Sequence, residues 1–404
     1  MTLLLLLAAP AQANGQNTHV WISLQAAEQV QDPTLRALLE AEQNQFINGS
    51  MFPDGGYAVD HAYGEAGHWE GLQDHYRDWI REGVDPKSAE AAPHVAFYMG
   101  MASHGMADQS FDAFYFSQSR YLDADFGWAE GTSFDEASDV IWSAVAGPSP
   151  VPVRSVPAEM PGLYEEVGIQ VDADTLDQGQ KLVITALELV ALLAKNEDTV
   201  ADYQAEFPWG GANLQEPYPG APADEARMVA AYLDSLWVDL NQGDQPLSVV
   251  ATVPEGGSYG WPVTDDPMAN RLGLVFSKSM DAAAITPEDI VLMSEDGTQI
   301  PVQVSFFYGS GSHVLHVLPQ GDLADATDYS LSLRAGAVAE DGRLMSEDFT
   351  TTFSTRPPPA DSGMDSGSED SGCGGCGAGL GGGGLGGGLL PGLLAGMMLR
   401  RRRR

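Results

Sequence analysis

One stretch of the sequence, AFYMGMASHGMADQSFDAFYF at residues 96–116, is apolar almost all the way round when it is drawn as a helix. Helices of this kind lie in the interior of a protein. His104, Asp108 and Asp112 recur in it at every fourth residue, so at about 100° per residue they share one stripe roughly 12 Å long. Buried His and Asp side chains are costly unless they are hydrogen-bonded, paired or bound to metal. The stretch therefore predicts a buried central helix whose polar stripe is either satisfied by neighbouring side chains or binds metal.

The composition limits the partners and the metal ligands of the chain. Its 404 residues suffice for two or three domains, and 57 Asp+Glu against 19 Lys+Arg give a formal net charge of -38. Such an acidic surface repels nucleic acid and suits a soluble protein in a salty or extracellular setting. Both cysteines, Cys373 and Cys376, lie in the glycine-rich C-terminal tail. Any metal site in the folded part must therefore use His and carboxylate ligands.

Between the two ends of the chain, the hydrophobic period changes once, near residue 247. Before it, residues 18–46, 67–82, 172–195 and 222–241 have helical patterns, and NGSMFPDGGYA at residues 48–58 is expected to be a loop. After it come seven short alternating or β-branched runs separated by turn residues. We therefore predict a multidomain chain with an all-α domain over residues 14–245 and an all-β sandwich over residues 246–356.

The two ends of the chain predict export. Residues 3–9 are rich in Leu and Ala and precede Ala11-Gln12-Ala13, so residues 1–13 are interpreted as a signal peptide cleaved before Asn14. Residues 357–372 form an acidic linker with too little apolar content to fold. Residues 373–404 combine the cysteines, a glycine-leucine segment and a terminal arginine cluster. This order resembles the MYXO-CTERM sorting tag, which implies processing by a sorting protease and a final location at the cell surface or in the medium. The alternative is a disordered low-complexity tail.

Four motifs of the helical region occur in order: THVWI at 18–22, FPDGGY at 52–57, GHW at 67–69 and AFYMGMASHGMAD at 96–108. Together they resemble the ligand segments and the central metal-binding helix of the zinc-dependent phospholipase C family. Within that family, similar strings occur in the catalytic domain of glycosylphosphatidylinositol-specific phospholipase D, which this region resembles. In the second region, LVFSKSMD, DYSLSLRAGAVAEDG and TTTFST resemble bacterial Ig-like domains of the S-layer-associated type, which implies a spacer or binding module.

The resemblance to the phospholipase C family also implies metal ligands for two zinc ions. One zinc ion would be bound by Asp54, His68, His104 and Asp108. Asp108 would also bind the second ion, together with His19 and the amino and carbonyl groups of Asn14 as the mature first residue.

The third metal site of the family departs from its usual pattern in this chain. Where relatives place His ligands, this chain has Asp112 at the end of the helix and Gly131 in place of a second His, and Asp135 falls at the position of the acidic ligand. A site built from carboxylates alone suits calcium, magnesium or manganese better than zinc, and it can also stay empty.

The activity that the resemblance implies is hydrolysis of a phosphodiester, with a phospholipid or lipid-linked substrate at a membrane surface. The metal ions would acidify water and neutralise the phosphoryl oxygens, and Asp54 would orient or deprotonate the water. Two alternatives stay open. A single-strand-specific zinc nuclease has the same ligand logic, although the acidic charge argues against it. A non-catalytic, metal-stabilised adhesion module is favoured by the loss of the third site.

Overall fold

The computed structural model describes residues 14–357 except 84, 125–132, 264–269 and 310. The expected signal peptide and sorting tag, and the expected linker beyond residue 357, lie outside the described residues. Within them, no helix is both long enough and apolar enough to cross a membrane.

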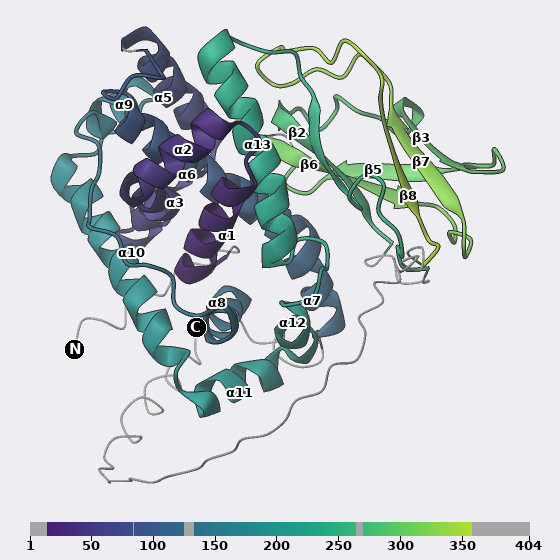
Figure 1. Ribbon diagram of the computed structural model, residues 1–404, viewed down its shortest axis with the longest axis horizontal. Coiled ribbons are helices and arrows are strands. Elements are labelled where there is room, and N and C mark those ends of the chain that lie inside the picture. The colour runs from purple at the N-terminus through teal and green to yellow at the C-terminus, as the bar shows by residue number, and fades with distance from the viewer. Residues whose placement is uncertain (1–13, 84, 125–132, 264–269, 310, 358–404) are drawn as a thin grey trace, which may run out of the picture. The chain divides into compact units, whose positions relative to one another are not determined.

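Helices make up the region before residue 245, as predicted (Figure 1). Their bounds are α1 (Gln16–Gln29), α2 (Pro33–Ala41), α3 (Gln43–Ala58), α4 (Tyr63–His68), α5 (Glu70–Gly83), α6 (Ala92–Ser110), α7 (Ser117–Leu122), α8 (Phe134–Ala146), α9 (Met160–Glu166), α10 (Ala173–Leu193), α11 (Glu197–Glu206), α12 (Pro208–Asn213) and α13 (Pro222–Gln242). A π-helical segment, η2 (Phe111–Phe116), continues α6 directly.

The predicted central helix is confirmed. Every residue from 95 to 116 is buried. Helices α1, α3, α5 and α13 pack around α6. The π-helical turn begins just before Asp112, so this residue lies on a wider helical turn than His104 and Asp108. Single π-helical turns of this kind are frequent at functional sites.

The loop expected at residues 48–58 is wrong, because this segment is the second half of α3. Its glycines serve a close helix contact instead of a turn. A Cβ atom built on Gly49 would lie 2.2 Å from the carbonyl oxygen of Phe97, and one built on Gly100 would lie 2.3 Å from that of Phe46. The backbones of α3 and α6 therefore touch, and this packing overrides the local turn signal of Asn, Gly and Pro.

The strands after residue 247 form the predicted sandwich. Their bounds are β1 (Val249–Val253), β2 (Leu272–Met280), β3 (Ile290–Ser294), β4 (Gln299–Ile300), β5 (Val302–Phe306), β6 (Ser312–Pro319), β7 (Asp328–Leu333) and β8 (Phe349–Ser354). One sheet has the order β1-β2-β6-β5 and the other β4-β3-β7-β8, and neighbouring strands within each sheet are antiparallel. All seven runs seen in the sequence form strands, and the two-residue strand β4 is an addition.

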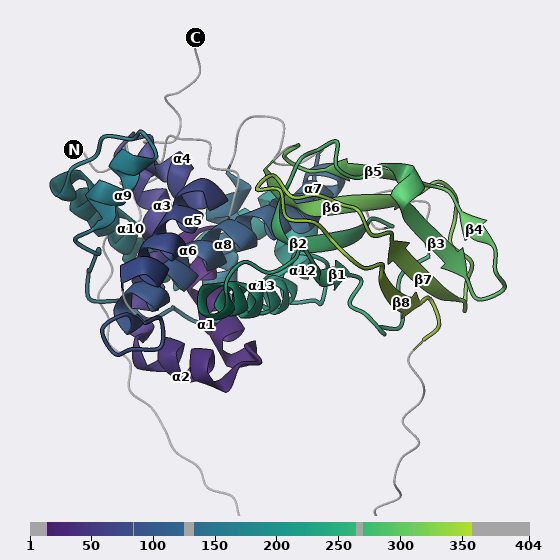
Figure 2. The ribbon, with the colours of Figure 1, turned by 90° about the horizontal axis from the view of Figure 1, so that it is seen from above.

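The sandwich packs directly on the helices. Figure 1 shows α13 between the other helices and the strands, and Figure 2 shows both sheets on one side of the helical region. Helix α13 contacts β1 and β2, and α6 contacts β6. One hydrophobic cluster contains Phe97 of α6, Leu233 of α13 and Phe276 of β2. The two regions therefore share one core.

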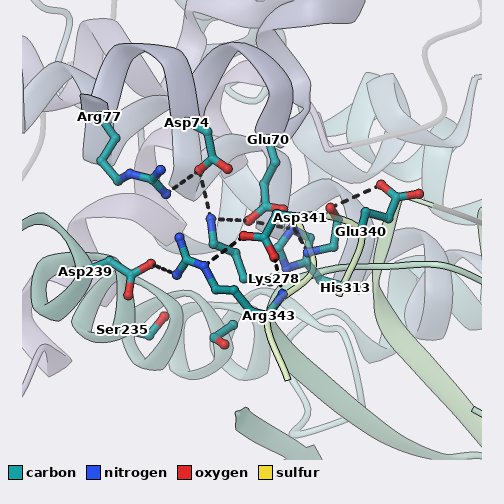
Figure 3. Close-up of polar contacts among 12 residues, drawn as sticks. Glu70, Asp74, Arg77, Ser235, Asp239, Lys278, His313, Glu340, Asp341 and Arg343 are labelled. Atoms are coloured by element: carbon teal, nitrogen blue, oxygen red, sulfur yellow. Dashed lines mark hydrogen bonds and ion pairs between the residues drawn. The ribbon is translucent and has the colours of Figure 1, made fainter. Parts of the chain in front are cut away.

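Buried charges also join the two regions, as Figure 3 shows. Lys278 of β2 is 0% exposed, and its Nζ atom lies 3.0 Å from Glu70 Oε1 and 2.8 Å from Asp74 Oδ1, both on α5. The backbone N–H of Ser279 donates to the other oxygen of Glu70 at 2.8 Å. Because both partners of each pair are present, these charges are compensated inside the interface.

Candidate metal centre

The first helix is held in place by a side chain from a distant helix. Asp139 of α8 accepts hydrogen bonds from the backbone N–H groups of Asn17 at 3.2 Å and Thr18 at 2.7 Å. The Thr18 hydroxyl donates to the same carboxylate at 2.7 Å. These bonds satisfy N–H groups in the first turn of α1, which have no partner within the helix. They fix the position of His19, whose ring stacks on His104 with centroids 3.8 Å apart.

Two further histidines present one ring nitrogen each to the same point. His68 Nδ1 lies 2.6 Å from the carbonyl oxygen of Gly64, and His104 Nδ1 lies 2.7 Å from that of Ser50. An N–H group at Nδ1 therefore donates to each carbonyl and leaves the lone pair on Nε2. The two Nε2 atoms lie 3.0 Å apart. Two lone pairs facing each other at this distance call for a proton or a cation between them.

Carboxylates complete the cluster. Asp108 Oδ2 lies 3.4 Å from His68 Nε2 and 3.3 Å from His104 Nε2, while Asp108 Oδ1 lies 3.0 Å from His19 Nε2. Asp54 Oδ1 lies 3.4 Å from His68 Nε2 and 3.7 Å from His104 Nε2. Four helices, α1, α3, α4 and α6, supply these five side chains.

The donor set fits zinc. Donor atoms form two groups, and within each group all of them lie within 4.8 Å of one another. One group is His19, Asp54 and His104, and the other is His68, His104 and Asp108. His104 can bind only one ion, because its Nδ1 donates to Ser50 and only Nε2 has a lone pair. Asp108 directs Oδ1 at His19 and Oδ2 at His68 and His104, so this carboxylate could join two ions side by side. Both ring nitrogens of His19, Asp54 Oδ1 and Asp108 Oδ1 are buried and form no hydrogen bond. Imidazole and carboxylate are ordinary zinc ligands, and such atoms are costly to bury unless something binds them.

The electrostatics of the cluster also favour a positive charge at its centre. Burial by itself would lower the pKa of His68, but the carboxylates of Asp54 and Asp108 raise it to about 9. Burial and the neighbouring imidazole of His19 lower the pKa of His104 to about 4. Burial opposes ionisation of Asp54, yet the imidazoles of His104 and His68 hold its pKa below the ordinary value. The Asp54 carboxylate is therefore ionised and attracts a cation.

The proposed third set is not assembled in the same way. Asp112 of η2 is buried, and burial together with the charges of Asp108 and Asp135 raises the pKa of its carboxyl well above the ordinary value. Asp112 and Asp135 are therefore neighbours, but within the described residues neither belongs to a close group of three donors. Gly131 lies outside the described residues.

Asn14 lies beside a residue that the sequence interpretation missed. Its side-chain amide donates to Glu225 Oε2 of α13 at 2.5 Å, and Glu225 is 0% exposed. Burial, with the charges of Asp108, Asp224 and Asp112, raises the pKa of the Glu225 carboxyl well above its ordinary value. In the sequence it is one of two acidic residues in the first turn of a helix, and only its burial distinguishes it. Gln16, whose amide donates to Asp54 Oδ2, was also missed, because nothing in its local sequence marks it.

Comparison with known proteins supports this assignment. Residues 18–111 match the family model for zinc dependent phospholipase C. Residues 243–355 match the model for the bacterial Ig-like domain. No curated protein matched the sequence.

Several solved structures show weak overall similarity. The S-layer protein rSbsC has 12% identity and a TM-score of 0.22, over 79% of this chain and 45% of that one. Domains 1–6 of the surface layer protein SbsC have 12% identity and a TM-score of 0.22, over 78% of this chain and 45% of that one. The alpha toxin from Clostridium absonum has 11% identity and a TM-score of 0.25, over 84% of this chain and 99% of that one. This chain thus spans less than half of both S-layer structures, and TM-scores this low establish no common fold. The family models show that the helical region carries a zinc dependent phospholipase C domain and that a bacterial Ig-like domain follows it.

Proposed function

We infer that this protein is an exported, zinc-dependent phosphodiester hydrolase of the phospholipase C or D type, acting on phospholipid head groups at a membrane surface. The observation that carries this inference is the pair of adjoining ligand groups that share His104. They lie in the segment that matches the zinc dependent phospholipase C model. The signal peptide and the tag-like tail predicted from the sequence are the support for export.

The ligands of this centre would be His19, Asp54, His68, His104 and Asp108. When bound there, zinc supplies positive charge to the phosphoryl oxygens and lowers the pKa of water. The Nδ1 contacts of His68 and His104 hold both rings in one orientation, so their Nε2 atoms stay directed at the centre. In the reaction, water adds to phosphorus, one phosphorus–oxygen ester bond breaks, and the leaving oxygen takes a proton.

Asp54 is the residue that we assign to the water. Gln16 donates to Asp54 Oδ2, whereas Oδ1 is directed at the two imidazoles and forms no hydrogen bond. Its lowered pKa makes it a weak base. These features support a role in binding metal and orienting water more than a role in deprotonating it.

The test is metal analysis and a substrate panel on the mature full chain. We expect at least two zinc ions per chain after dialysis, and faster cleavage of phosphatidylcholine or phosphatidylinositol vesicles than of single-stranded DNA. His104→Ala should lose both metal and activity, because His104 belongs to both ligand groups. His75→Ala is the control, since this side chain is 43% exposed and pairs with Glu166 on the surface.

Two results would contradict the inference. A clear preference for DNA would identify a nuclease. Tight metal binding without hydrolysis of any of these substrates would identify a metal-stabilised adhesion module.

A further inference from the structure

We propose that the Ig-like domain supplies a positioning residue to the metal centre: Tyr308 orients Asp112, so the hydrolase site is built from both domains. This proposal rests on the function inferred above for the metal centre. The contact joins two separate matches, because Tyr308 lies within the Ig-like match at 243–355 and Asp112 directly follows the phospholipase C match at 18–111.

The contact itself joins the sandwich to the ligand helix. Tyr308 follows β5, and its phenol donates a hydrogen bond to Asp112 Oδ2. Asp112 stands one helical turn after the ligand Asp108. The ring of Tyr308 also meets the ring of Trp69 edge to face, with centroids 5.4 Å apart, and Trp69 directly follows the ligand His68. Tyr308 therefore touches the chain next to two metal ligands.

The position of Tyr308 is fixed by the strands around it. The backbone N–H of His313, at the start of β6, donates to Gln109 Oε1 of α6 at 2.7 Å. Arg271, just before β2, donates through Nη1 to the carbonyl oxygen of Ala113 at 2.8 Å. These two bonds lie on either side of Asp112 along the helix. The buried Lys278 pairs of Figure 3 hold β2 against α5 as well. Hydrogen bonds from the sandwich therefore hold the helical segment that carries Asp112 in place.

The chemical consequence is that only one of the two carboxylate oxygens of Asp112 accepts a hydrogen bond. Oδ2 accepts from the phenol, whereas the buried Oδ1 forms no hydrogen bond. A hydrogen bond to one oxygen restricts rotation of the carboxylate and so determines where the second oxygen lies. Tyr308 keeps 39% of its surface exposed, so it also borders the solvent side of the site.

The test is Tyr308→Phe in the mature full chain, which keeps the ring against Trp69 and removes only the hydroxyl. Mutation of residues that hydrogen-bond to metal ligands typically lowers metal affinity or activity by about 10–100-fold. We expect a loss of that size in kcat for phosphatidylcholine or in zinc affinity, with KM and the midpoint of thermal unfolding nearly unchanged. Tyr259→Phe is the control, since this tyrosine of the same region is 51% exposed.

A double-mutant cycle separates positioning from a structural effect. If Tyr308 acts through Asp112, Tyr308→Phe should cause little further loss in an Asp112→Asn background. Zinc affinity is measured by competition with a chelator in the absence of substrate. This measurement tests the role of Tyr308 even if the wild-type chain hydrolyses none of the substrates, so failure of this proposal can be distinguished from failure of the inferred function. Additive losses, or a Tyr308→Phe chain with wild-type kcat and zinc affinity, would overturn the proposal.

Discussion

Single residues decide how the N-terminal segment meets the metal centre. Asn14 is 3% exposed and donates to the buried Glu225, while Asn14 Oδ1 and Glu225 Oε1 form no hydrogen bond. Cleavage before Asn14 would create an α-amine in this buried place. Such an amine has a pKa of about 7.7–8.0 and can lose its proton to bind metal, whereas an amide within a longer chain does not readily do so.

Residues added before Asn14 should therefore weaken one metal site and lower turnover, with the fold retained. A chain released by a protease at Asn14 is compared with one that keeps a few extra residues. Zinc content, phosphodiesterase rate and circular dichroism are measured for both. Equal zinc and equal rates would show that the N-terminus takes no part in the site.

At the scale of elements, the contact between α3 and α6 sets the geometry of the ligands. Helix α3 carries Asp54 and the Ser50 carbonyl that binds His104 Nδ1, and α6 carries His104 itself. Both helices depend on Gly49 and Gly100 for their close approach. Any group that separates these backbones also moves the carbonyl away from the imidazole, so stability and metal binding are coupled here.

Gly100→Ala should destabilise the protein by about 1–3 kcal/mol, the usual cost of overpacking, and should weaken zinc binding. Gly71→Ala is the matched control, because a Cβ atom there meets nothing within 4 Å. In a helix that change should be neutral or stabilise by up to about 1 kcal/mol. Urea unfolding and chelator competition measure both effects. Equal stability of the two variants would show that the helices can separate freely.

At the scale of the whole described molecule, the helical region and the sandwich behave as one folding unit. They share a hydrophobic cluster and a set of buried ion pairs. Lys278 lies between Glu70 and Asp74, so removing it takes away the closest cation of Glu70, whereas Asp74 keeps the guanidinium of Arg77 at 2.7 Å. A buried pair broken on one side typically costs about 3–5 kcal/mol.

Lys278→Met should therefore lower the free energy of unfolding by about that amount. We expect fluorescence and circular dichroism to report the same shifted transition, because both regions lose stability together. Lys181→Met, which changes an exposed lysine of α10, should have little effect. Separate transitions for the helices and the strands, with only one of them shifted, would contradict a single unit.

The order of helices and strands and most of the ligand residues could be predicted from the sequence, because they depend on local patterns of residues. The change of period near residue 247 separates helices from strands, and the apolar stretch at 96–116 forms the buried central helix. The ordered motifs also identified His19, Asp54, His68, His104 and Asp108, which the structure brings together. Ligands repeated on one helix, or placed in short motifs, leave a signal in the sequence itself.

Other features were decided only by tertiary structure. Residues 48–58 are helical because Gly49 packs on α6, although the segment has the composition of a loop. Glu225, Asp139 and Tyr308 reach the metal centre or its supports from segments far away in the chain, and Gln16 reaches Asp54 from another helix. Each of them has an ordinary local context. Their roles depend on which helices and strands pack side by side, and the free energy that selects this packing comes from contacts between segments, which no local pattern records.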